Sequence, residues 1–323
     1  MNYAVGTDIA KINTRSYTGL NGRKIGALYP KNNVKWSNRM NFNINIPKAV
    51  QQMPVVFLFA PTARNGITLV QRLLNSTRQI IIFGEDGYFI EVMPECFVKK
   101  MDFFAKAEYN RIKFREKYFA RNTEFWSSNL GPDGAQYMQV MAQNFSCFVL
   151  FHQQWSEAKG LKRWGIKHPL PNLITLDFFL RFLINARFIY LYRNLFDVAR
   201  SAKARKWMQS PDEFTTMAQR WQGNLLPVLQ SPWERVLVLK YEDLVADPET
   251  YIKKIEEFTE ISNIDRNVMK RKINTFRGKI EDGESQNQYI EPKDLTGQES
   301  AILYEHAARA VAVTGYRDNG KRS

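Results

Sequence analysis

The stretch Pro54-Val-Val-Phe-Leu-Phe-Ala-Pro-Thr-Ala-Arg64-Asn-Gly66-Ile-Thr-Leu-Val-Gln-Arg-Leu-Leu-Asn-Ser-Thr77 decides the fold class of this chain. Its apolar run, Val55 to Phe59, predicts a buried strand, and the apolar residues after Gly66 recur at helical spacing. A strand, a turn containing glycine and a helix N-terminus together form an anion site, because the first N–H groups of the helix have no partner within it. The turn lacks the G-x-x-x-x-G-K-[ST] pattern of nucleoside-triphosphate loops, so we expect a different phosphate ligand.

Apolar runs and helical patterns alternate from this stretch onward. Strands are predicted at 54–60, 79–84, 163–168, 186–192 and 235–240. Helical patterns cover 66–76, about 90–121, about 132–158, 172–184, 196–208, 213–229 and 248–261. Short apolar strands separated by helices predict an α/β fold, in which a central, mainly parallel sheet is flanked by helices.

Two segments stand apart from this alternation. Residues 1–50 are polar and rich in asparagine, and we expect an irregular N-terminal arm that ends in an edge strand near Phe42 to Ile46. Residues 51–323 are expected to form a single domain. Within it, a long helical insertion at about 88–160 is the predicted source of a region that covers the substrate.

The composition limits the classes of partner and compartment. No uninterrupted apolar run of about 18 residues occurs, so no membrane span is expected. The N-terminus lacks the pattern of a signal peptide. Cys96, Cys147 and three scattered histidines provide neither a disulfide framework nor metal-ligand spacing. We therefore expect a cytoplasmic protein without a bound metal.

The net charge of +14 indicates a polyanionic partner. The densest basic region runs from Lys106 to Arg121, where aromatic and basic side chains are interleaved. That pattern fits either a nucleic-acid face or an amphipathic helix with a solvated basic side. We favour the helix and expect no nucleic-acid partner, since a nucleotide with several phosphates explains the charge as well.

A second anion site is predicted after the strand at 186–192. This strand places Arg193 at its carboxyl end, where open α/β sheets bind ligands. Ser201 and Arg205 lie four residues apart on the next helix and so share a face. Two guanidinium groups and a hydroxyl can together clamp a phosphate. The alternative is an ordinary ion pair between Arg193 and Asp197.

Two further strand ends carry candidate catalytic groups. Trp164-Gly-Ile-Lys167-His168-Pro directs a lysine into the space above the sheet. Phe83-Gly-Glu85-Asp86-Gly places two carboxylates at another strand end, where either can act as a general base. The alternative for each carboxylate is a cap or a turn residue.

Together, these motifs resemble the sulfotransferases that use 3′-phosphoadenosine-5′-phosphosulfate (PAPS), over roughly residues 53–265. Arg64-Asn-Gly-Ile-Thr68-Leu is similar to the family's 5′-phosphosulfate loop, commonly Arg-Ser-Gly-Thr-Thr/Ser-Leu. Arg193 and Ser201, eight residues apart, resemble its 3′-phosphate motif, and Arg205 matches a basic position of protein-tyrosine sulfotransferases.

Two more segments share the resemblance. The Lys167 segment resembles the Gly-Glu-Lys-Thr-Pro element of many members, with Ile166 where Glu is frequent. Lys240-Tyr241-Glu-Asp-Leu-Val-Ala-Asp-Pro-Glu249 is similar to the family's Tyr-Glu-Asp-Leu-x-x-Asp-Pro-Glu stretch. The resemblance implies a P-loop-like sulfotransferase fold.

The resemblance also implies an enzyme that moves a sulfuryl group from PAPS to a hydroxyl or amine of a small-molecule acceptor, without a metal and with PAP as product. Its donor would be held by Arg64, Asn65, Gly66, Ile67, Thr68, Leu69, Arg193, Ser201, Arg205, Tyr241, Arg277 and Lys279. Its catalytic groups would be Arg64, Lys167 and a carboxylate base, Glu85 or, one residue on, Asp86. The helical insertion would shape the acceptor pocket with its aromatic residues, although core packing would explain the same residues.

Some positions depart from the family pattern. Ile67 replaces a hydroxyl residue that normally faces the phosphates, and Asn65 replaces a serine. Loss of one charge-assisted hydrogen bond costs about 1.5–3 kcal/mol, so weakened donor binding is expected. His168 follows Lys167 directly, and adjacent residues of a strand point to opposite faces. A structural role for His168 is therefore favoured over the role of base that a histidine has in cytosolic members.

Two other functions remain open from the sequence. A P-loop-type kinase would need a lysine and a metal-holding Ser or Thr at the first loop, and this chain has neither there. A non-catalytic nucleotide or RNA binder would account for the charge and the interleaved aromatics.

Overall fold

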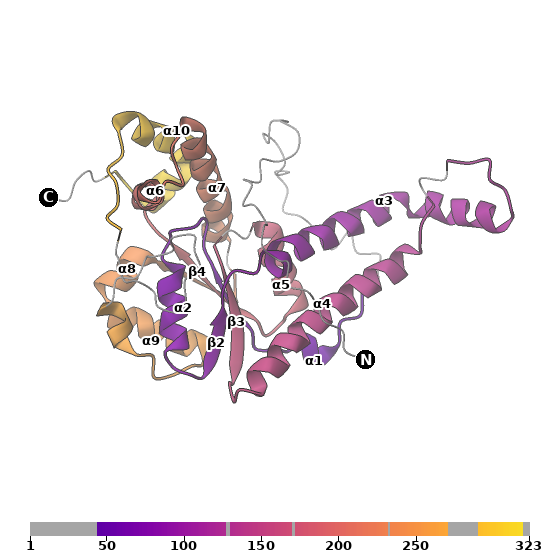
Figure 1. Ribbon diagram of the computed structural model, residues 1–323, viewed down its shortest axis with the longest axis horizontal. Helices are drawn as coiled ribbons and strands as arrows, with labels where there is room; N and C mark the ends of the chain where they lie inside the picture. Colours follow the sequence, from indigo (N-terminus) through magenta and orange to yellow (C-terminus); the bar gives the residue numbers. More distant parts are fainter. Residues whose placement is uncertain (1–43, 127–129, 170–171, 232, 271–289, 319–323) are drawn as a thin grey trace, which may run out of the picture. The chain divides into compact units, whose positions relative to one another are not determined.

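The five predicted strands form one sheet in the computed structural model (Figure 1). They are β1 (Val56–Phe59), β2 (Ile80–Phe83), β3 (Arg163–His168), β4 (Arg187–Tyr192) and β5 (Val236–Lys240). All neighbouring strands are parallel, in the order β2-β3-β1-β4-β5. The structure describes residues 44–126, 130–169, 172–231, 233–270 and 290–318. The predicted α/β class with a parallel sheet is confirmed.

Each predicted helical stretch contains a helix. These helices are α2 (Ile67–Asn75), α3 (Met93–Phe119), α4 (Gly134–Glu157), α5 (Leu173–Phe182), α6 (Leu195–Ala204), α7 (Pro211–Gln230) and α9 (Pro248–Thr259). The sequence patterns did not indicate α1 (Lys48–Gln51), α8 (Tyr241–Ala246), α10 (Gly297–Thr314), the π-helix η2 (Tyr88–Val92) or the 3₁₀ helix η4 (Arg266–Lys270). Residues 44–46 are not a strand, and the start of the predicted edge strand lies outside the described residues. The chain divides into two units, Met1–Arg39 and Met40–Ser323, and only the second is described.

Strand β1 shows why the strands of this sheet are apolar on both faces. Val56 and Leu58 belong to an aliphatic core, to which α2 and α9 contribute. The alternate residues Phe57 and Phe59 face an aromatic core instead, where the Phe57 ring lies 4.6 Å from that of Phe179 in α5. Side chains alternate along a strand, so a sheet covered by helices on both faces needs a continuous apolar run.

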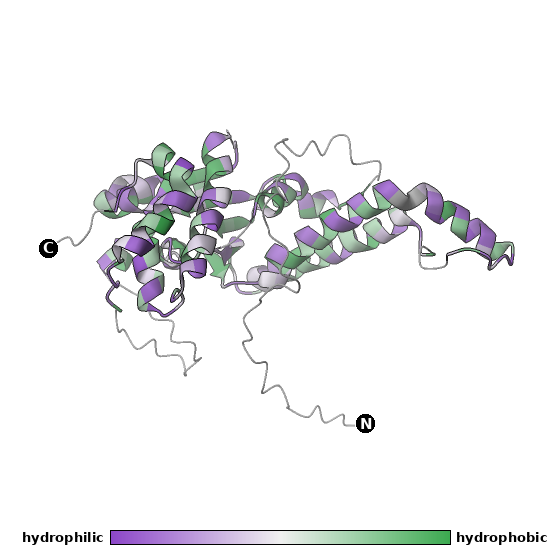
Figure 2. Ribbon diagram, turned by 90° about the horizontal axis from the view of Figure 1, so that it is seen from above, coloured by the Kyte–Doolittle hydropathy of each residue, from purple (hydrophilic) through white to green (hydrophobic). Residues whose placement is uncertain are grey.

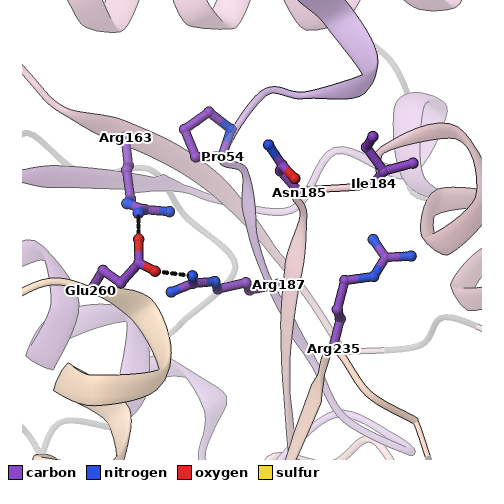
Figure 3. A pocket seen from close by; sticks show the side chains of 7 residues that line it. All are labelled: Pro54, Arg163, Ile184, Asn185, Arg187, Arg235 and Glu260. Atoms are coloured by element: carbon purple, nitrogen blue, oxygen red, sulfur yellow. Dashed lines mark hydrogen bonds and ion pairs between the residues drawn. The ribbon is translucent and has the colours of Figure 1, made fainter. Parts of the chain in front are cut away.

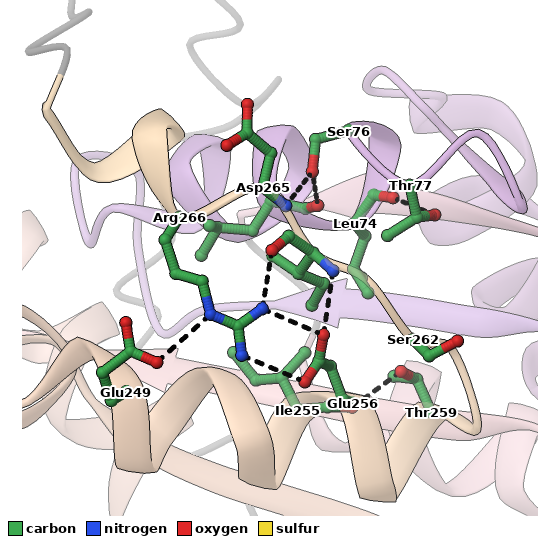
Figure 4. Close-up of polar contacts among 12 residues, drawn as sticks. Leu74, Ser76, Thr77, Glu249, Ile255, Glu256, Thr259, Ser262, Asp265 and Arg266 are labelled. Carbon is green, nitrogen blue, oxygen red and sulfur yellow. Dashed lines mark hydrogen bonds and ion pairs between the residues drawn. The ribbon is translucent and has the colours of Figure 1, made fainter.

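The far end of α2 is held by the segment after α9 (Figure 4). Arg266 lies between two carboxylates of α9, at 3.2 Å from Glu249 and 3.4 Å from Glu256. The backbone N–H of Asp265 donates to Ser76 Oγ at 3.0 Å, at the C-terminus of α2. These contacts fix α2 at the end opposite to its N-terminus, which carries the predicted anion site.

An arginine cluster occupies the amino edge of the sheet (Figure 3). Glu260 forms ion pairs with both Arg163 and Arg187, the first residues of β3 and β4. Arg235 donates to the carbonyl of Leu183 at 2.6 Å, just after α5. These side chains line a cavity of about 340 Å³. The site motifs lie at the opposite, carboxyl edge, so we assign this cluster to structural pairing and helix capping.

Replacing Glu260 with glutamine is expected to lower stability at neutral pH only. The hydrogen bond from Arg187 lowers the pKa of the Glu260 carboxyl below its ordinary value. The pair therefore contributes fully above the unfolded pKa of about 4.3 and is lost as the pH falls through the lower folded value. Urea unfolding should give a lower free energy of unfolding for Glu260→Gln than for the wild type at about pH 7, and this difference should become smaller toward about pH 3. A difference that stays constant over this range would contradict the assignment.

Candidate functional site

Each of the five strands carries one predicted site residue at or just beyond its carboxyl end. Arg64 follows β1, Glu85 follows β2, and Lys167 is the last but one residue of β3. Arg193 and Tyr241 come directly after β4 and β5. The carboxyl ends of parallel strands lie at one edge of a sheet, where open α/β folds bind their ligands. The topology thus brings five widely separated segments of the chain to one edge.

The loop after β1 has backbone φ angles that residues with a side chain seldom adopt. Arg64 has a φ of 70° and Gly66 a φ of 91°, both in the left-handed region. A Cβ atom on Gly66 would lie 2.5 Å from Cδ2 of Tyr241, so the aromatic ring packs directly on the loop backbone. Gly66 is the N-cap of α2, and no side chain caps this helix. Its first N–H groups are thus available to an anion.

The Asn65 side chain holds the loop after β1 in place. The side chain is 1% exposed, and its amide nitrogen donates to the carbonyl oxygen of Thr62 at 2.7 Å and to Thr62 Oγ1 at 2.9 Å. Its carbonyl oxygen accepts a hydrogen bond from the backbone N–H of Arg193 at 2.9 Å. Asn65 therefore ties the loop after β1 to the loop after β4. Serine, with a shorter side chain, could not make all of these contacts.

The side chain of Ile67 does not replace a hydroxyl that faces a phosphate. It is 5% exposed and belongs to the aliphatic core beneath the loop. The first turn of α2 directs this side chain into the core, and the expected weakening of donor binding stays a prediction. Thr68 is the exposed hydroxyl of that turn, and Leu69 packs against the same core.

Two arginines lie on the neighbouring loops. Arg64 Nε donates to Ser201 Oγ at 3.0 Å, and the Arg64 guanidinium lies 5.5 Å from the centre of the Trp207 ring. Arg193 lies over the Tyr241 ring at 4.6 Å, and its buried Nε has no hydrogen-bond partner among the described residues. Burial of a donor without a partner is costly, which is a reason to expect an anionic ligand here.

The ion pair considered as an alternative for Arg193 is present but long. Arg193 lies 4.0 Å from Asp197, whereas Arg200 approaches the same carboxylate to 2.8 Å. Arg205 is the residue that ends α6, one turn beyond Ser201. Arg193 thus directly follows β4, Ser201 lies within α6 and Arg205 is the C-cap of α6, and the clamp itself stays a prediction.

Lys167 lies between the first loop and the end of β2. Its Nζ is 2.9 Å from Glu85 Oε1 and 3.5 Å from Thr68 Oγ1. Asp86, in contrast, accepts the backbone N–H of Phe89 at 3.0 Å and so begins η2. Of the two predicted carboxylates, Glu85 is the one that contacts Lys167, whereas Asp86 has the capping contact that was its alternative.

His168 contacts a carboxylate that the sequence patterns did not single out. Its Nε2 lies 2.7 Å from Glu91 Oε1, and the imidazole is almost fully buried. Glu91 belongs to η2, and π-helical turns occur frequently at functional sites. No spacing rule predicts such a turn, so only the structure could pair Glu91 with His168.

The remaining predictions fall on other regions. Arg277 and Lys279 lie outside the described residues. The aromatic residues of the insertion do not share one environment, because Phe104 is buried whereas Tyr109 and Trp126 are exposed. Within the described residues, no helix is both long and apolar enough to cross a membrane.

Replacing Gly66 with alanine is expected to destabilise the protein. A left-handed φ costs an L-residue about 1–3 kcal/mol, and the added Cβ would overlap the Tyr241 ring. Chemical denaturation should therefore show a free energy of unfolding lower by at least that amount. Gly297→Ala is the matched control, since nothing lies within 4 Å of a Cβ there. Equal stability of the two variants would contradict the packing of Tyr241 on the loop.

Comparison with protein families gives one match, which covers the whole five-stranded sheet and most of the described helices. The model described as "Sulfotransferase family" matches residues 55–265. This range includes every strand of the described residues and the predicted site residues other than Arg277 and Lys279. No curated protein matches this chain significantly.

Several solved structures are similar at low sequence identity. The sulfotransferase domain of the Synechococcus PCC 7002 olefin synthase is 15% identical, with a TM-score of 0.49, covering 85% of this chain and 99% of that one. The sulfotransferase domain of the curacin biosynthetic pathway is 14% identical, with a TM-score of 0.46, covering 82% and 99%. A sulfotransferase from Mycobacterium tuberculosis H37Rv is 15% identical, with a TM-score of 0.40, covering 69% and 72%.

Proposed function

This chain belongs to the sulfotransferase family, and from that premise we propose that it transfers a sulfuryl group from PAPS to a hydroxyl or amine of a small-molecule acceptor. Family membership makes the protein an enzyme that transfers sulfate and removes the kinase and the non-catalytic binder as alternatives. The donor, the acceptor and the roles of individual residues are the proposal. In it, residues 51–323 form the catalytic domain and the insertion shapes the acceptor pocket.

The observation that carries the choice of donor is the pairing of two cationic loops. Arg64 precedes the N-terminus of α2, and Arg193 follows β4 with a buried Nε that has no hydrogen-bond partner in the part of the chain that the structure describes. Asn65 bonds the two loops to each other. Two such sites side by side fit a nucleotide with an anionic group at each end, and a bisphosphorylated nucleotide sulfate has this charge pattern. Thr68 and Ser201 add one hydroxyl to each site.

The proposed transfer chemistry uses the groups at the ends of β2 and β3. When bound, PAPS supplies the sulfuryl group and a phosphate as leaving group. Lys167 and Arg64 provide fixed positive charge beside Thr68, where negative charge on a leaving phosphate would be stabilised. Glu85 is the proposed general base that takes the proton from the acceptor. Its contact with Lys167 orients the carboxylate at the same edge of the sheet.

The other two candidates for the base have less suitable surroundings. The Asp86 carboxylate caps η2, so its oxygen is engaged by the backbone. The imidazole of His168 is almost fully buried and held by Glu91. These contacts support Glu85 over Asp86 and His168.

An assay of sulfate transfer from PAPS to a panel of acceptors tests the proposal. The full chain is incubated with PAPS carrying radiolabelled sulfate and with a panel of small phenols, aliphatic alcohols and amines, and labelled products are separated. We expect label on at least one class of acceptor, and none when Lys167 is replaced by alanine. Transfer from an aryl sulfate in place of PAPS would contradict the choice of donor.

A further inference from the structure

The basic, aromatic segment from Lys106 to Arg121 separates into an inner and an outer side in the structure. Arg111 and Arg115 are turned inward and hold the loop between α3 and α4. Arg115 donates to the Pro132 carbonyl at 3.0 Å and lies 3.6 Å from the Asp133 carboxylate. The Arg111 guanidinium lies 4.8 Å from the centre of the Phe104 ring. These two arginines are therefore part of the fold of the helical hairpin.

The outer side combines exposed aromatic residues with lysines. We define the distal surface as five residues of α3, Tyr109, Ile112, Lys113, Lys117 and Phe119, together with the exposed Trp126 of the loop that follows the helix. Its aromatic side chains are exposed to unusual extents, 69% for Tyr109, 78% for Phe119 and 73% for Trp126. Figure 2 shows hydrophobic and hydrophilic residues alternating along this part of α3.

Helical spacing arranges these residues in two adjacent rows. Tyr109, Ile112 and Phe119 are separated by three and seven residues, so they lie on one side of α3. Lys113 and Lys117, four residues apart, form the row beside them. The Lys113 ammonium lies 4.4 Å from the centre of the Tyr109 ring, so the rows are in contact. The carboxylate of Glu116 lies between the two rows.

We propose that the distal surface docks on an anionic lipid bilayer, with its aromatic and aliphatic side chains among the headgroups and its lysines against lipid phosphates. Aromatic side chains with a polar edge favour the bilayer interface, and a helix with apolar and basic rows lies in its plane. Single-stranded nucleic acid is bound instead in basic grooves with stacking platforms. Here the side chains of Tyr109, Ile112 and Phe119 and of both lysines project from the outside of one helix, which favours a lipid surface.

Vesicle co-sedimentation of the full chain tests this docking. The vesicles are of phosphatidylcholine alone, or of phosphatidylcholine and phosphatidylglycerol in equal parts. We expect binding to the anionic vesicles only, weakened by added salt. The double variant Lys113→Ala/Lys117→Ala should lower the partition coefficient about 20- to 30-fold, since each lysine near an anionic surface contributes about a factor of five. Phe119→Ser/Trp126→Ser should lower it as well, at unchanged net charge.

The matched control removes the same charge elsewhere. Lys253→Ala/Lys254→Ala changes two exposed lysines of α9 and should leave vesicle binding near the wild-type value. Equal vesicle binding by the α3 and α9 variants would overturn the proposal, because binding would then depend on the net charge of the protein and not on the position of the lysines. The proposal would also be overturned by binding to a fluorescent single-stranded RNA without binding to vesicles. A dimer in sedimentation equilibrium that Phe119→Ser/Trp126→Ser dissociates, again without vesicle binding, would assign the surface to self-association instead.

Discussion

Replacement of Glu85 by glutamine should lower kcat about 10²- to 10⁴-fold and leave the affinity for adenosine 3′,5′-bisphosphate nearly unchanged. The amide keeps the size of the side chain but cannot accept a proton. Glu85 Oε1 lies 2.9 Å from Lys167 Nζ, so the carboxylate is held beside the group that we propose stabilises the leaving phosphate. Turnover is measured with saturating PAPS and acceptor, and affinity by calorimetry.

Asp86→Asn is the comparison that separates the two neighbouring carboxylates. The Asp86 oxygen accepts the N–H of Phe89, and an asparagine oxygen can make the same bond. We therefore expect a far smaller loss of turnover than in Glu85→Gln. Near-wild-type turnover in both variants would rule out a carboxylate base at this strand end. A large loss in Asp86→Asn alone would move the role to that residue.

Replacement of Arg193 by alanine should raise the Kd for adenosine 3′,5′-bisphosphate about 10- to 100-fold. Hydrogen bonds to charged groups contribute about 1.5–3 kcal/mol each, and about 1.4 kcal/mol corresponds to a factor of ten. The Arg193 guanidinium is placed for this role, since it packs on the Tyr241 ring and has a buried Nε without a hydrogen-bond partner among the described residues.

Arg266→Ala is the matched control for this loss of affinity. Arg266 is also an arginine in ion pairs, with Glu249 and Glu256, but it lies near the C-terminal end of α2 and is more exposed than Arg193. Its removal takes away the same charge and should leave the Kd unchanged. A similar weakening in both variants would show that net charge, not the site, determines nucleotide affinity.

The sheet and its active edge could be predicted because they depend on local patterns. Apolar runs such as Val55 to Phe59 exceed what a half-exposed strand carries, and they indicate parallel strands buried on both faces. Once the strands are known to be parallel, their carboxyl ends must share an edge. Arg64, Lys167 and Arg193 could therefore be placed at that edge without knowing any side-chain contact.

Such local patterns could not predict the orientation of individual side chains. Ile67 was noted as standing where the family has a hydroxyl residue, and the patterns did not show that the first turn of α2 directs its side chain into the core. The patterns also did not indicate that the Asn65 side chain bonds two loops together. Both outcomes depend on contacts between segments distant in sequence. The contact between Glu91 and His168 is of the same kind, and no periodicity signals it.

The sequence patterns did not predict helix α10, for a different reason. Its apolar residues are mostly alanine and valine, and it carries a non-helical residue, Ala307, within its length. The pattern is therefore weak, and the helix is stabilised by packing on α7 and by the hydrogen bond that Ala310 N–H donates to Gln222 Oε1 at 3.1 Å. Tertiary contacts of this type override a low local signal.

Titration of the full chain with adenosine 3′,5′-bisphosphate, followed by thermal unfolding, tests most directly the claim that two cationic loops bind a nucleotide phosphorylated at both ends. A ligand present at about 100 times its Kd stabilises a protein by about 2.7 kcal/mol, so a clear rise in Tm is expected. ATP with magnesium and a single-stranded oligonucleotide, at the same concentration, should raise it far less. Equal stabilisation by ATP with magnesium, or none by the bisphosphate, would contradict the proposed donor site.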